Sequence, residues 1–163
     1  MDYLEILEKK KNLTENASEQ ERQKAMEYGI RMAVEERNDP PRIHEMMKKS
    51  FVACSEKEQW ITLSYEVEEW EQNPIGTMHG GLIATAIDST CGILVRYLSG
   101  TLRTPTVSMT INYLATVPVG ERLLVTARAV KVGRSLVNLC AEAVLESSKK
   151  TAATATAVFF PIS

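Results

Sequence analysis

The residues of this 163-residue chain that could do chemistry gather in one short stretch. Residues 73–81 read Asn-Pro-Ile-Gly-Thr-Met-His-Gly-Gly, and Asp88 follows His79 by nine residues. Glycines at the start of a helix let a ligand approach backbone N–H groups that lack a helical partner, at the positive end of the helix dipole. Such an end suits a carbonyl oxygen that becomes an oxyanion. A purely structural interpretation, a tight turn at Gly80 and Gly81 capped by His79, stays open.

Asp88 is the residue that could act as a general base or a nucleophile. Its neighbours from Ile83 to Ile93 are mostly small or apolar, so this part of the chain should be buried. A carboxylate in such surroundings lowers stability unless it is paired or faces an aqueous cleft. The structural alternative is a carboxylate bonded to Ser89, to Thr90 or to a neighbouring strand.

His79 and Asp88 cannot reach one carbonyl within a single chain. At about 100° per residue they lie on opposite sides of a helix, roughly 13 Å apart along it. If both act, one subunit must supply His79 and another must supply Asp88. The spacing therefore predicts a two-fold homodimer with two shared sites.

Other kinds of site lack their residues. There are two histidines in the chain, and Cys54, Cys91 and Cys140 are widely spaced, so we expect no metal site and no cofactor. The chain has neither a Gly-x-Ser-x-Gly elbow nor a glycine-rich phosphate loop. Three scattered cysteines also form no disulfide framework, which favours a reducing cytoplasm.

Composition narrows the possible partners. Nineteen basic and 21 acidic residues give a net charge of -2 and a pI near 5.8, which argues against a nucleic-acid or anionic-membrane binder. The acidic N-terminus is unlike a signal peptide. Asp88 and Arg96 interrupt the most apolar stretch, residues 82–98, so we expect a buried core helix and no membrane span.

Residues 1–50 are predicted to form a helical N-terminal extension. Ser18 and Glu21 have the spacing of a capping box, and Asn-Asp-Pro-Pro at 38–41 should end the helix that it starts. A short second helix should follow. We expect these apolar side chains to turn inward: Met26, Ile30, Ala33 and Val34 in the first helix, and Ile43, Met46 and Met47 in the second. A DNA-binding helix-turn-helix is the alternative, but it would need a basic face.

Residues 51–163 are predicted to form one α+β domain. A helix apolar on nearly every side should run from about 79 to 98 and end near Ser99 and Gly100. Alternating apolar residues predict strands at 61–67, 106–113, 123–132, 137–145 and 153–159. The alanines of the last strand would let the helix lie close to the sheet. The pattern indicates an antiparallel sheet around a long central helix.

The motifs taken together resemble a known family. Residues 73–81 with Asp88, then residues 106–114, 118–121 and 131–135, resemble the hotdog-fold acyl-CoA thioesterases, and most of all their phenylacetate-pathway (PaaI-like) branch. The resemblance covers residues 51–163, and the hotdog fold is an antiparallel sheet wrapped around a central helix. Residues 1–50 are longer than the usual lead-in of this family.

The resemblance implies roles for five residues. Asn73 and His79 would bind and polarise the thioester carbonyl, with the backbone N–H of Gly80 as the main oxyanion donor. Asp88 would activate water or attack the carbonyl directly. Thr106 takes the place of a serine that helps to orient the water in some members of the family.

The resemblance also implies the substrate and the assembly. By this resemblance Gly81 is expected to bind substrate. The groove for the CoA arm would be bordered by Gly133, Arg134 and Ser135. The implied reaction is hydrolysis of an acyl-CoA to free acid and CoA by a homodimer, paired into a dimer of dimers. Two alternatives stay open: a non-catalytic acyl-CoA-binding module and a hotdog dehydratase or hydratase. A pure binder would not need the acid at position 88.

Overall fold

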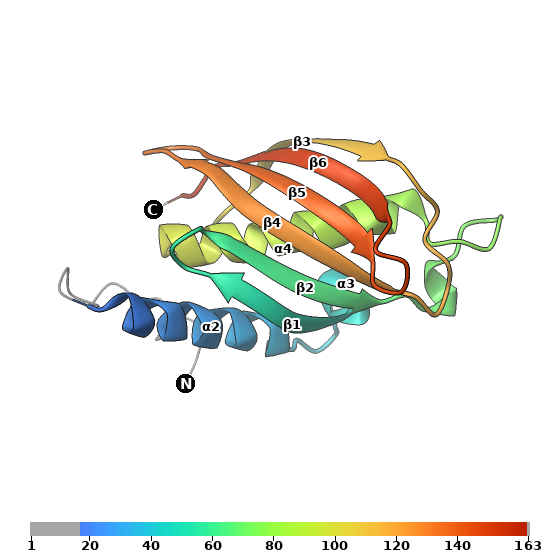
Figure 1. Cartoon of the computed structure of the whole chain (residues 1–163), viewed down its shortest axis with the longest axis horizontal. Helices are drawn as coiled ribbons and strands as arrows, with labels where there is room; N and C mark the ends of the chain where they lie inside the picture. Colours follow the sequence, from blue (N-terminus) through green and yellow to red (C-terminus); the bar gives the residue numbers. More distant parts are fainter. Residues whose placement is uncertain (1–16, 163) are drawn as a thin grey trace.

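A long helix, α4 (Gly80–Ser99), packs against one face of a six-stranded antiparallel sheet (Figure 1). The structure is a computed structural model and describes residues 17–162 of the chain. The strands are β1 (Lys48–Ser55), β2 (Trp60–Glu66), β3 (Thr106–Tyr113), β4 (Arg122–Val132), β5 (Val137–Leu145) and β6 (Thr151–Phe159). They are hydrogen-bonded in the order β1-β2-β4-β5-β6-β3. The predicted α+β hotdog fold is confirmed.

The residues at both ends of α4 explain where it begins and ends. His79 is the N-cap, and its Nδ1 accepts a hydrogen bond from the N–H of Gly81 at 2.9 Å. At the other end Gly100 has a φ of 70°, a left-handed conformation that glycine adopts without steric cost. The helix predicted over residues 79–98, ending near Ser99, is confirmed.

Small residues on the sheet let α4 approach it closely. Ala153, Ala155 and Ala157 of β6 are buried on one side of the strand, in the same core as Ile87 and Leu94 of α4. Figure 1 shows α4 running behind the strands, which curve around it. The alanine-rich last strand therefore has the place predicted for it.

By length and composition alone, α4 would also be able to cross a membrane. Half of its most apolar window is buried inside the structure, and the core helix of a globular protein meets the same criteria. Contacts with five of the six strands identify α4 as such a core helix.

Two helices precede the sheet, as predicted. α2 (Glu19–Glu35) starts with the expected capping box, in which Ser18 and Glu21 each accept a hydrogen bond from the other's backbone N–H. α3 (Ile43–Met46) is a single turn, and a 3₁₀ helix, η1 (Glu69–Glu71), follows β2. The face of α2 that packs on β1 and α4 is the predicted one, comprising Met26, Ile30, Ala33 and Val34. Residues 1–16 of the predicted extension lie outside the described residues.

Two predictions for this part of the chain are wrong. β1 was not predicted, and it begins at Lys48, inside the segment expected to be helical. This strand lies at the edge of the sheet and begins with two lysines, so it lacks the apolar alternation of a half-buried strand. In α3, Ile43 and Met46 are 53% and 48% exposed, and of the three predicted side chains Met47 alone is buried. A single turn presents too little surface to bury all three.

Candidate active site

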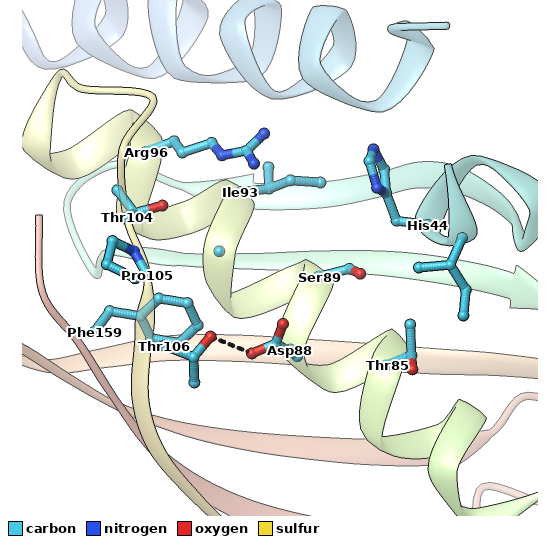
Figure 2. A pocket seen from close by; sticks show the side chains of 12 residues that line it. His44, Thr85, Asp88, Ser89, Ile93, Arg96, Thr104, Pro105, Thr106 and Phe159 are labelled. Carbon is cyan, nitrogen blue, oxygen red and sulfur yellow. Dashed lines mark hydrogen bonds between the residues drawn. The ribbon is translucent and has the colours of Figure 1, made fainter. Parts of the chain in front are cut away.

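The carboxylate of Asp88 lies in a cavity of about 250 Å³ between α4, α3 and the chain that enters β3 (Figure 2). The side chain is half-buried, as expected for a carboxylate at a cleft. Thr90, one of the partners considered for it, is instead turned into the core, where its hydroxyl donates to the carbonyl of Ala86 and bonds the hydroxyl of Tyr65. The cavity therefore has a carboxylate on its wall.

Thr106, the first residue of β3, holds this carboxylate. Its hydroxyl donates to Oδ1 of Asp88 at 2.7 Å (Figure 2). The resemblance implied that Thr106 orients a water molecule, whereas here it fixes one oxygen of the acid directly. A bond from a neighbouring strand also fits the structural alternative for Asp88. However, Oδ2 accepts no hydrogen bond from residues 17–162, and that oxygen is free to act in the cavity.

Asn73 orders the loop that leads to α4. Its Oδ1 accepts hydrogen bonds from the N–H of Ile75 at 3.1 Å and of Thr77 at 3.2 Å, and its Nδ2 donates to the Thr77 hydroxyl at 3.0 Å. Gly76 in this loop has a φ of 78°, which favours glycine. The N–H of Gly76 also donates to the Asn73 carbonyl at 3.0 Å, so residues 73–76 form a turn, and Nδ2 has one further hydrogen with which to donate.

The start of α4 carries the donors for an oxyanion. Because Nδ1 of His79 accepts a hydrogen bond from Gly81, the proton of a neutral imidazole lies on Nε2, which can donate outward. The N–H of Gly80 has no acceptor within residues 17–162, as is usual for the first helical amides. The Gly80 carbonyl accepts from the hydroxyl of Tyr113 at 2.9 Å, and a Cβ on Gly81 would lie 3.1 Å from Nδ1 of His79. The capping role of His79 is confirmed, and it leaves both donors available.

One chain does not bring the two groups of site residues together. Asp88 and Thr106 line the cavity, whereas Asn73, His79 and Gly80 do not. α4 is unbroken between the two groups, as the spacing argument required. Each chain therefore carries two separate half-sites.

Comparison with known proteins identifies the family. The thioesterase superfamily model matches residues 75–152. Acyl-coenzyme A thioesterase 13 of Mus musculus is 30% identical over 96 residues, which cover 59% of this chain and 68% of that protein. The chain belongs to the thioesterase superfamily. The chain spans between 54% and 68% of the length of three such relatives.

Solved structures of other proteins share the fold. The PaaI protein of the E. coli phenylacetic acid degradation operon superposes with a TM-score of 0.66 at 19% identity, over 73% of this chain and 83% of that one. A protein of Streptococcus mutans bound to acetyl CoA gives a TM-score of 0.60 at 28% identity, over 68% of this chain and 87% of that one. The first likeness, at such low identity, shows the fold alone.

The corner that the resemblance assigned to the CoA arm lies apart from both half-sites of this thioesterase-superfamily chain. Gly133 and Arg134, between β4 and β5, line a second cavity of about 430 Å³ together with Gly100, beyond the C-terminal end of α4, and Ser135 does not line it. Gly133 also has a local reason to be glycine, because a Cβ there would lie 2.9 Å from the carbonyl oxygen of Leu136. A role of these residues toward substrate stays a prediction.

Sequence reasoning missed part of the lining of the Asp88 cavity. Ser89 and Arg96 of α4 and His44 of α3 line it too (Figure 2). The sequence pattern could have predicted Ser89 and Arg96. With Thr85 and Gly92 they recur at spacings of four and three residues, which places them on one face of an otherwise apolar helix. No sequence pattern could have predicted His44, since the packing of α3 decides where this side chain lies.

We predict that Asn73→Ala lowers the free energy of unfolding by about 1–2 kcal/mol, because two loop N–H groups lose their acceptor. Asn73→Asp keeps that acceptor and should retain most of the stability. Urea unfolding of both variants and the parent measures the difference. An alanine variant as stable as the parent would show that the loop does not depend on this side chain.

Proposed function

We propose that the chain hydrolyses acyl-CoA thioesters and that Asp88 is its base or nucleophile. The observation that carries the proposal is the Asp88 carboxylate in its cavity, with Oδ1 held by Thr106 and Oδ2 free. A general base must lie within hydrogen-bond reach of the water that it activates. The proposal places that water in the cavity that Asp88 lines.

The reaction proceeds in two steps when Asp88 acts as a base. Its Oδ2 takes a proton from water while the water oxygen bonds to the thioester carbon, and the carbonyl oxygen becomes an oxyanion. The N–H of Gly80 stabilises that oxyanion, together with Nε2–H of His79 and Nδ2–H of Asn73. As the oxyanion collapses, the carbon–sulfur bond breaks and the proton passes from Asp88 to the departing CoA thiolate. If Asp88 is the nucleophile, Oδ2 attacks the thioester carbon and the carbon–sulfur bond breaks, which gives an anhydride and the CoA thiolate. Water then hydrolyses the anhydride to the free acid and the Asp88 carboxylate, and a proton of the water passes to the thiolate.

The oxyanion donors belong to a second subunit in this proposal, and β3 supports such a pairing. This strand is last in the sheet order, so its outer side has no strand partner within residues 17–162. Val107, Tyr113 and Leu114 on or next to it are between 52% and 59% exposed. An unpaired edge with exposed apolar side chains is a site for pairing with another chain.

The two ends of β3 carry the two half-sites. Thr106 at its start bonds Asp88, and Tyr113 at its end bonds the Gly80 carbonyl. If two copies of β3 pair antiparallel about a two-fold axis, the start of one lies beside the end of the other. This pairing would bring Asp88 of one chain toward Gly80 of its partner, twice per dimer. A dimer of dimers and a cytoplasmic location stay predictions.

Asp88→Asn is expected to keep the fold and to lower kcat by about 100-fold or more, because an amide neither accepts the proton nor attacks the carbonyl. Release of free CoA thiol measures the rate, and circular dichroism checks the fold. Glu35→Gln, at an exposed carboxylate of α2, is the matched control and should be as active as the parent. A folded, fully active Asp88→Asn protein would contradict the proposal, whereas binding without turnover by the parent would favour the binding module.

Thr106→Val should lower kcat roughly tenfold and leave KM nearly unchanged, because the isosteric side chain no longer holds Oδ1 of Asp88. Thr106→Ser retains a hydroxyl and should recover most of the rate. The same thiol assay applies to both. Equal rates for the valine variant and the parent would remove Thr106 from the mechanism.

Mixing inactive Asn73→Ala and inactive Asp88→Asn subunits should restore activity, because a mixed dimer has one site with both defects and one intact site. With random exchange half of the dimers are mixed, so about a quarter of the parent activity should return. Native mass spectrometry verifies the exchange. Mixed dimers without recovered hydrolysis would argue against a shared site.

A further inference from the structure

Arg96 places a positive charge on the wall of the Asp88 cavity. The proposed hydrolysis mechanism does not involve this residue. It lines the cavity with His44, Ser89 and Thr104. Its Nε is buried and has no hydrogen-bond partner among residues 17–162. No carboxylate of residues 17–162 lies within 4 Å of its guanidinium, although seven other ion pairs form in that part of the chain.

The position of Arg96 in the helix explains the charge in part. It lies in the last turn of α4, where the helix dipole favours a cation. The dipole does not give the buried Nε–H an acceptor, and a buried donor without one lowers stability. A guanidinium stays charged at any pH at which the protein is folded. The molecule therefore keeps a cation facing the cavity at a cost to its stability.

Glu45, an acidic residue beside His44 at this cavity, is already engaged. Both carboxylate oxygens of Glu45 accept hydrogen bonds, from Asn38 and from the N–H of Arg42. Burial lowers the pKa of His44, and the charges of Lys49 and Arg96 act in the same direction, against Glu45 and Glu36. His44 is therefore neutral at neutral pH, and Arg96 is the permanent positive charge of the cavity wall.

The distance between Asp88 and Arg96 sets the size of what can lie between them. Eight residues of helix correspond to about 12 Å between their Cα atoms. Helical side chains lean toward the N-terminus, and Figure 2 shows the Arg96 guanidinium extending over Ile93 in the direction of His44. Gly92, between the two charged residues, adds no side chain to the cavity wall. A space of about 250 Å³ suits a short acyl group.

We propose that the acyl group of the substrate carries a carboxylate at its far end, a few carbons from the thioester, and that Arg96 binds this carboxylate. The inference rests on the proposed function, because the thioester must lie at Asp88. An arginine can hold a carboxylate through two parallel N–H···O bonds. Asp88 lies at the other end of the cavity, and its negative charge repels a carboxylate from that end. The two charged residues together therefore orient a dicarboxylic acyl group with its thioester toward Asp88.

Glutaryl-CoA and pentanoyl-CoA test the inference, because they share a five-carbon chain and differ in a terminal carboxylate against a methyl group. We expect the parent to prefer glutaryl-CoA in the thiol assay. Arg96→Met should lower kcat/KM for glutaryl-CoA roughly 30-fold and leave pentanoyl-CoA unchanged or faster. Arg96→Lys keeps the charge and should recover part of the loss. Arg128→Met removes an exposed arginine of β4 and should change neither rate.

Three results would overturn the inference. In the first, the parent does not prefer glutaryl-CoA. In the second, the Arg96→Met variant keeps the preference for glutaryl-CoA. In the third, Arg96→Met loses equally on both thioesters and binds free CoA more weakly, which would mean that Arg96 meets a CoA phosphate. Thermal unfolding adds a separate readout, because removal of an unpaired buried charge should not lower the midpoint, whereas loss of a structural contact would.

The proposed function fails separately, if Asp88→Asn leaves hydrolysis of both thioesters unchanged. In that case the kcat/KM values of the parent and of Arg96→Met for the two thioesters still measure carboxylate recognition. If Asp88→Asn is inactive, calorimetry measures carboxylate recognition without turnover. The Asp88→Asn protein should bind glutaryl-CoA more tightly than pentanoyl-CoA, and the additional substitution Arg96→Met should abolish the difference. Equal affinities for the two thioesters in the presence of Arg96 would refute the inference whatever the rates are.

Discussion

An unbroken helix is the constraint on which the rest of the molecule depends. α4 runs without interruption from Gly80 to Ser99, with its N-terminal donors at one end and Asp88 more than two turns away on the opposite side. A straight helix cannot fold these groups onto one another. The sheet curves around α4 and the alanines of β6 let it approach, so the core fixes the helix rigidly. Rigidity makes each half-site well defined and leaves each of them incomplete.

Several polar groups of α4 line the Asp88 cavity. Thr85, Ser89 and Arg96 recur there with Asp88 beside them, while Ile87 and Leu94 are buried in the core. A helix stabilised only by burial would not place a carboxylate and an unpaired guanidinium in such a position. The cost is tolerable because the other faces of α4 bury apolar surface against five strands. The stability of the core thus supports the two charges for which we propose roles in binding and chemistry.

Local signals in the sequence were enough to predict the elements that depend on local chemistry. The capping box at Ser18 and the glycine at position 100 mark helix ends through contacts a few residues apart, and both have the predicted geometry. Alternation identified five of the six strands, because each of them has one side facing α4. β1 was not identified, since this edge strand begins with two lysines and carries no such alternation.

The candidate site shows the same limit. Asp88 was predictable as a charge in an apolar helix, and Thr106 followed from the family resemblance. His44 reaches the cavity only because α3 packs beside α4, which spacing along the chain does not encode. Whether a residue lines a pocket is a tertiary property, and the roles assigned to Asn73, His79 and Gly80 depend in addition on a second chain.

The wall that α3 contributes to the cavity comes from outside the segment that carries the residues proposed for hydrolysis. Ile43 and His44 precede the first strand, whereas Asp88 and Thr106 belong to α4 and β3. The architecture is therefore modular: a change in the leading segment could reshape the recognition of the acyl group without moving the acid or the strand that holds it. Selectivity for the acyl group and reactivity toward the thioester can therefore change independently in the evolution of this chain.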